Sequence, residues 1–150
     1  MKVTTELKVC LDLAILEARR RGHELSTVEH LLVALLQDTE ARTVLQNLGA
    51  DIAALEENLD AFLSELETIS GGRAGIIEVQ PSLGFSRVVN RAGLHCESSG
   101  KDEMGTVHVL VAIFSELDSH AAALLERAGV SRLDLVRFLS HGRVPTPEGP

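Results

Sequence analysis

The chain has 150 residues, of which 45% are hydrophobic, and a formal net charge of −8 at pH 7. This length allows one domain, or two small units that share a core. The acidic charge argues against nucleic acid as a partner, because proteins that bind it neutralise phosphates with Lys and Arg. An aromatic content of 3% leaves Leu, Val, Ile and Ala to build the core, which suits packed helices.

Neither the first residues nor the cysteines carry a targeting or metal-binding signal. Lys2 and Glu6 interrupt any apolar region that a signal peptide would need. No apolar run reaches the ~20 residues that cross a bilayer, so we expect a cytoplasmic location and no membrane partner. Cys10 and Cys96 form no CxxC pair and no Cys/His cluster at zinc-finger spacing. We expect both to be small buried hydrophobic side chains, with a disulfide or ligand role as the alternative.

Apolar periodicity predicts four helices in the first half of the chain. Residues 4–21 form the first, since Leu and Ala recur on one face at spacings of four and three, and Gly22 is expected to end it. Thr27 is the expected N-cap of a strongly apolar second helix. A third helix follows Asp38, and Asp51 caps a fourth.

A break in this pattern divides the chain into two repeats. Residues 70–75 are rich in Gly, and we expect them to be flexible. The short β-branched run at 76–79 has no partner strand in the pattern, so an extended linker on the surface is expected. Ser82 then caps the next helix. The predicted boundaries are 4–67 for repeat one, 68–81 for the linker, 82–142 for repeat two and 143–150 for a Pro-rich tail or linker start.

The second half of the chain repeats the first at an offset of about 78 to 80 residues. The matched features are the segment 27–36 with 106–115, Gly49 with Gly129, and the cap Asp51 with Ser131. This alignment places His108 opposite Glu29, and Asp102 or Glu103 opposite Glu24, so the acidic pair belongs to the first repeat alone. The predicted fold is all-α, with eight helices in two tandem four-helix repeats related by pseudo-twofold symmetry.

Motifs for catalysis or cofactor binding do not appear in the sequence. The pair Gly100-Lys101 is followed by Asp102 and lacks the first glycine of a phosphate-binding loop. GxSxG and HExxH are absent as well. We therefore expect no catalytic residue, no metal and no cofactor in this domain.

The most polar group of residues, His23-Glu24 with Glu29-His30, flanks the turn between the first two helices. In a purely structural interpretation, Glu29 complements the helix dipole, His30 packs against the first helix, and His23-Glu24 is a solvated corner. Alternatively, His23, Glu29 and His30 centre a small hydrolase or metal-dependent enzyme, although two histidines seven apart are poor ligand spacing. In a third interpretation, Glu24 and Glu29 present carboxylates on one edge of the domain to a partner.

The sequence also resembles a known family. Residues 23–36, HELSTVEHLLVALL, resemble the signature of the Clp amino-terminal repeat domain. Residues 130–134 and 138–142 resemble the end of this domain in ClpA-like unfoldases. The resemblance extends over about residues 6–142, and it assigns residues 1–142 to one domain.

The resemblance implies a non-catalytic domain in front of an AAA+ ring, which unfolds proteins for the ClpP protease. Such domains bind protein substrates or adaptors, and in ClpA-like proteins the adaptor is ClpS, which brings N-degron substrates. The adaptor-binding positions fall on Glu24, Glu29, Ser82 and Arg87, where Ser82 replaces the usual Thr. We then expect exposed carboxylates at a rim, which would pair with basic groups on the adaptor, in a domain that is a monomer when isolated. A free-standing regulatory protein of the same fold is the alternative.

Overall fold

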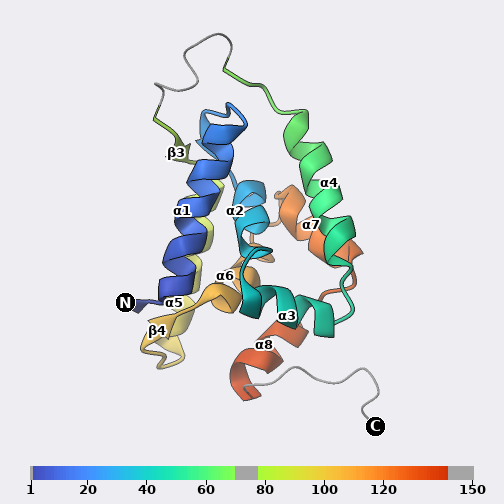
Figure 1. Cartoon of the computed structure of the whole chain (residues 1–150). Helices are drawn as coiled ribbons and strands as arrows, with labels where there is room; N and C mark the ends of the chain where they lie inside the picture. The colour runs from blue at the N-terminus through green and yellow to red at the C-terminus, as the bar shows by residue number, and fades with distance from the viewer. Residues whose placement is uncertain (1, 70–77, 142–150) are drawn as a thin grey trace.

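A computed structural model describes residues 2–69 and 78–141 of the chain. Across these two ranges it contains eight α-helices and four strands of two residues each (Figure 1). The helices are α1 (Thr5–Arg20), α2 (Val28–Leu35), α3 (Thr39–Asn47), α4 (Ile52–Ser64), α5 (Leu83–Ser98), α6 (Thr106–Ile113), α7 (His120–Arg127) and α8 (Arg132–His141). The strands are β1 (Lys2–Val3), β2 (Leu25–Ser26), β3 (Gln80–Pro81) and β4 (Glu103–Met104). The predicted all-α fold of two four-helix repeats is confirmed, whereas the predicted flexible stretch at 70–75 and the tail at 143–150 lie outside the described residues.

Short polar side chains start the helices where the sequence indicates. Ser82 Oγ accepts the N–H of Phe85 at 3.1 Å, and Asp51 Oδ1 accepts the N–H of Ala54 at 3.1 Å. Each bond satisfies one of the backbone donors that a helix leaves unpaired in its first turn. Four of the helices are followed by a residue with positive φ, a backbone conformation that favours glycine. These residues are Gly22, Gly49, Gly100 and Gly129.

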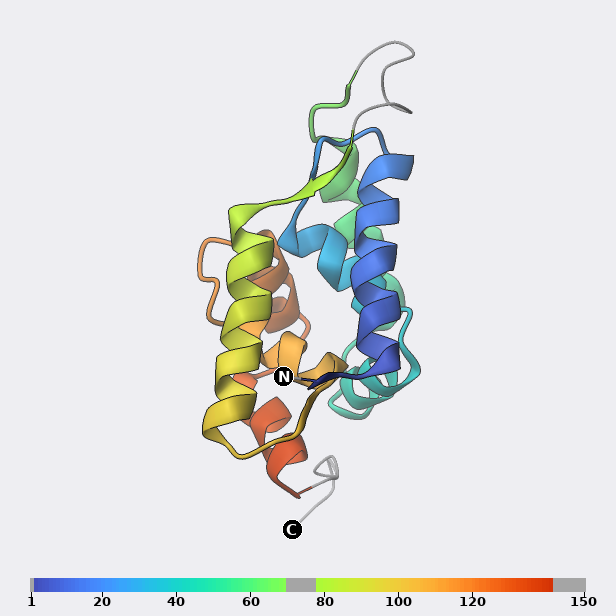
Figure 2. The same cartoon turned by 90° about the vertical axis from the view of Figure 1, so that its left-hand side faces the viewer.

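The two long helices, α1 and α5, lie side by side and run in opposite directions, with α2 and α6 between them (Figure 2). α1 packs on α2, α5 packs on α6, and α2 contacts α4 and α7 on its other side. Leu31, Leu35 and Leu110 are fully buried at this centre. One continuous core therefore serves both repeats, and burial of each such leucine stabilises the fold by about 1.5–3 kcal/mol.

Two short parallel sheets of two strands each connect the repeats. β1 of the first repeat pairs with β4 of the second, and β3 pairs with β2 in the symmetry-related arrangement. The run that ends at Val79 was predicted to be a surface linker without a partner, and this is wrong for its described end. Val79 is buried, and the N–H groups of Gln80 and Ser82 donate to the carbonyls of Glu24 and Ser26 at 3.2 and 2.9 Å. The linker is thus fixed to the first repeat where it enters α5.

The structure corrects the alignment of the two repeats at one place. α2 begins at Val28 and α6 begins at Thr106, an offset of 78 residues, as between α1 and α5. Val107 is therefore the counterpart of Glu29, and the predicted counterpart His108 is wrong by one position. The error arose because the letters Thr-Val recur at an offset of 79, while the backbone follows the helix caps.

The predicted burial of the two cysteines is confirmed. Cys10 and Cys96 are buried, free thiols, and burial raises the pKa of Cys10 to about 11. Both are thus poor nucleophiles at neutral pH. Among the described helices, none combines the length and the apolar character that a bilayer crossing requires.

A candidate docking pocket between the two repeats

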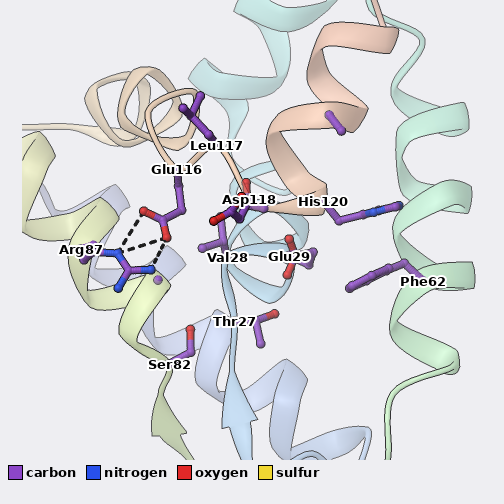
Figure 3. A pocket seen from close by; sticks show the side chains of 13 residues that line it. Thr27, Val28, Glu29, Phe62, Ser82, Arg87, Glu116, Leu117, Asp118 and His120 are labelled. Carbon is purple, nitrogen blue, oxygen red and sulfur yellow. Dashed lines mark hydrogen bonds and ion pairs between the residues drawn. The ribbon is translucent and has the colours of Figure 1, made fainter.

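A surface pocket of about 610 Å³ opens where the first turns of α2, α5 and α7 meet (Figure 3). We call it the inter-repeat pocket. The lining residues that matter below are Glu29, Phe62, Ser82, Gly84, Arg87, Glu116, Asp118 and His120. These residues come from both repeats, so the pocket exists only when the two halves are packed together.

Three of the four predicted site residues line this pocket: Glu29, Ser82 and Arg87. Glu24 does not line it. Glu24 is exposed and directly precedes β2, and its carbonyl accepts the Gln80 N–H, two residues before Ser82. The β2–β3 ladder therefore keeps Glu24 on the edge that adjoins the start of α5.

The predicted exposure of Glu29 is wrong. Glu29 is only 7% exposed, and its Oε2 accepts a hydrogen bond from the backbone N–H of Ala121 at 2.9 Å. Ala121 lies in the first turn of α7, where backbone N–H groups are unpaired and the helix dipole favours a negative charge. The carboxylate of one repeat thus stabilises a helix start in the other, while the side chain still borders the pocket (Figure 3).

Arg87 is held by a carboxylate that the sequence did not identify. Arg87 Nε lies 3.2 Å from both carboxylate oxygens of Glu116, and its Nη2 also contacts Oε2. Arg91 Nη1 reaches Glu116 Oε1 at 3.3 Å. Hydrogen bonds from Arg87 hold the pKa of the Glu116 carboxyl below its ordinary value, and Arg91 adds to this effect. A single carboxylate in a loop carries no motif, so only its contacts reveal it.

An aromatic pair forms the opposite wall of the pocket. The rings of Phe62 and His120 are stacked, with centroids 4.3 Å apart and an angle of 13° between their planes (Figure 3). Phe62 comes from α4 and His120 from the start of α7. The pocket therefore offers a flat apolar surface facing a charged wall, a combination typical of sites that bind protein side chains.

His23 and His30 form a buried pair beside the pocket, so the predicted solvated corner at His23 is wrong. His23 is 4% exposed, His30 is 0% exposed, and His23 Nδ1 lies 2.8 Å from His30 Nε2. The Thr27 N–H donates to His30 Nδ1, so we assign the His30 proton to Nε2, which donates to His23. Burial lowers the pKa of both imidazoles, and that of His30 to about 4.

The metal-dependent alternative gains no support from this geometry. The two imidazoles bond directly to each other, and Glu29 is bound to the α7 start instead of joining them. Within residues 2–69 and 78–141, no group of three His, Cys, Asp or Glu side chains is arranged to hold a metal ion. His108, the true counterpart of His30, repeats only the capping contact, with Nδ1 accepting the Gly105 N–H at 2.9 Å.

A second pocket of about 720 Å³ occupies the symmetry-related position at the starts of α1, α3 and α6. Its chemistry differs from that of the first pocket. Thr4 stands there in place of Ser82, and Asp38 caps α3 and accepts the hydroxyl of Thr106 at 2.9 Å. Among the described residues, no arginine lines this second pocket, so the two repeats present unlike surfaces there.

The fold defines a small all-helical domain made of two four-helix repeats, with a pocket between them. The family model described as the Clp repeat (R) N-terminal domain matches residues 2–128. The chain therefore belongs to the Clp repeat N-terminal domain family, as the resemblance of residues 23–36 predicted.

Curated relatives place this domain in larger proteins. A ClpA homolog protein of Fuscovulum blasticum is 39% identical over 145 residues, which are 96% of this chain and 18% of that protein. The chaperone protein ClpB of Bacillus cereus is 26% identical over 140 residues, which are 92% of this chain and 16% of that protein. The chain thus spans less than a fifth of the length of these relatives.

Solved structures with the same fold come from several Clp proteins. The N-terminal domain of ClpD from Arabidopsis thaliana has a TM-score of 0.69 at 18% identity, covering 91% of this chain and 90% of that one. The Hsp104 N-terminal domain from Candida albicans has a TM-score of 0.77 at 15% identity, covering 96% and 95%. A complex of the ClpV N-domain with a VipB peptide has a TM-score of 0.76 at 19% identity, covering 93% and 86%.

Proposed function

We propose that this chain is the non-catalytic docking domain of a ClpA-like AAA+ unfoldase and that the inter-repeat pocket receives an adaptor or substrate protein. One observation carries the proposal. Glu29 of the first repeat and Ser82 and Arg87 at the start of the second, which the family resemblance alone had selected from two separate segments, line a single pocket. Residues chosen without knowledge of the fold would not be expected to converge in this way.

The chemistry of the pocket supports a protein ligand. Arg87 has a half-exposed side chain that binds carboxylates, Ser82 adds a hydroxyl, and Glu24 lies exposed on the adjoining edge. Exposed ion pairs contribute only about 0.2–1 kcal/mol each, so these charges would set orientation and association rate more than affinity. Apolar contact with Phe62 and with Leu117, which is 84% exposed, would add to the affinity.

A ClpS-type adaptor is the partner we propose, because the 39% identical relative is a ClpA homolog and the chain has the adaptor-binding residue types at their expected positions. The complex of the ClpV N-domain with a VipB peptide supports a protein segment as the ligand of this fold. Attachment to an AAA+ ring that feeds ClpP follows from the same proposal.

Calorimetric titration with a ClpS-type adaptor tests the proposal. We expect binding by the wild-type chain, and Glu24→Ala and Arg87→Ala should each weaken it by about two- to fivefold. Glu57→Ala is the matched control, because Glu57 is an exposed carboxylate on α4 that does not line the pocket. Absence of binding by the wild-type chain would refute the adaptor proposal, and equal binding by all four proteins would refute the site.

A further inference from the structure

The two repeats differ most in one loop beside the pocket. The α2–α3 connection has three residues, 36–38, whereas the α6–α7 connection has six, 114–119. The longer loop places Glu116 against α5 of its own repeat and adds Asp118 to the inter-repeat pocket. The shorter loop of the first repeat has no residue equivalent to Glu116, and the counterpart of Arg87 at the offset of 78 is Val9, so the described part of the first repeat has no equivalent contact.

Three residues of α5, namely Arg87, Arg91 and Gly84, keep Glu116 close to this helix. Glu116 is 8% exposed, although it lies in a loop, and two guanidinium groups compensate its buried charge. Gly84 on α5 allows this approach. A Cβ at Gly84 would lie 3.2 Å from Glu116 Oε2 and 3.3 Å from Val28 Cγ2, so even an alanine would require these side chains to shift by a few tenths of an ångström.

The contact also fixes which edge of Arg87 remains available. Glu116 binds the edge formed by Nε and Nη2. A guanidinium is planar and can bind a second carboxylate through its two Nη atoms. That second edge faces away from Glu116, on a side chain that is 54% exposed.

Only one carboxylate makes ion pairs with Arg87 and Arg91 in the described part of the chain. Arg87 and Arg91 together carry two positive charges against the single charge of Glu116. Asp118 of the same loop also acts on Arg87 and brings the local charge to balance, but it is exposed and makes no ion pair in the described part of the chain, so it does not occupy the second edge of Arg87.

We propose that Glu116 is a positioning residue of the docking pocket, which holds Arg87 with its free edge outward to meet an acidic group of the partner. The proposal rests on the function proposed above. Without Glu116, the long Arg87 side chain would sample many rotamers, and its ordering would oppose binding. The longer α6–α7 loop and Arg87 together therefore distinguish this pocket from the symmetry-related one.

A double-mutant cycle with the ClpS-type adaptor tests this role. Glu116→Gln keeps the size of the side chain and removes its charge, and we expect it to weaken binding by about two- to fivefold. Arg87→Ala should weaken binding by a similar factor, and the double variant should bind no worse than Arg87→Ala alone. Glu56→Gln is the matched control, because Glu56 pairs with Arg42 away from the pocket and should bind like wild type.

A second readout on the free protein separates positioning from general stability. The Arg87 Nε–H resonance should be distinct in wild type and should move to the position of a mobile arginine in Glu116→Gln, while the Tm stays within a few degrees. Full binding by Glu116→Gln, alongside a loss in Arg87→Ala, would overturn this inference alone. Absence of binding by wild type would overturn the proposed function and, with it, this role.

Discussion

Replacement of Glu29 by Ala should destabilise the fold as well as affect docking. The variant removes the acceptor of the Ala121 N–H, which is buried in the first turn of α7. An unsatisfied buried donor costs about 1–3 kcal/mol, and loss of the negative charge at a helix start costs about 0.3–1 kcal/mol more. We therefore expect the free energy of unfolding to fall by about 2–3 kcal/mol.

Urea denaturation followed by circular dichroism measures this loss. Glu24→Ala is the matched control, since Glu24 is exposed and contributes only its backbone carbonyl to the β2–β3 ladder. Its free energy of unfolding should stay within about 0.5 kcal/mol of wild type. Equal stability of Glu29→Ala and Glu24→Ala would refute the reasoning, because both would then be surface carboxylates.

Three further predictions concern the hydrophobic core, the packing of Gly84 against Glu116, and the pH dependence of stability. Leu35→Ala should lower the free energy of unfolding by about 2–5 kcal/mol in a urea titration, because Leu35 is fully buried in the shared core. Gly84→Ala should weaken adaptor binding in the titration described above, since its Cβ would displace Glu116, and unchanged binding would contradict the close packing. His30 has a folded-state pKa of about 4, so the unfolded chain binds more protons between about pH 6.5 and 4. Stability should therefore fall as pH falls through this window, by at most about 3 kcal/mol, and His30→Gln should show a flatter profile in urea titrations at pH 7 and pH 5.

Local chemistry in the sequence was sufficient to predict most of the fold. Asp51 and Ser82 cap the helices they were expected to cap, since a cap depends on residues only three positions away. The alignment of the repeats slipped at α6, where the shared Thr-Val letters outweighed the cap contact of His108.

The candidate site was harder to predict because its contacts are distant in sequence. Glu29 is buried by a helix start that lies 92 residues away, so its neighbours in the sequence gave no indication of burial. Glu116 lies 29 residues from Arg87 and belongs to no motif. The family resemblance selected the candidate site residues, but the structure was needed to distinguish the exposed Glu24 from the buried Glu29.

Mapping of amide resonances during titration with a ClpS-type adaptor tests the central claim most directly. Docking at the inter-repeat pocket predicts the largest shifts at Glu24, Ser82, Arg87 and Leu117, with small shifts around Thr4 and Asp38 in the symmetry-related pocket. Largest shifts around Thr4 and Asp38, or no shifts at all, would contradict the account.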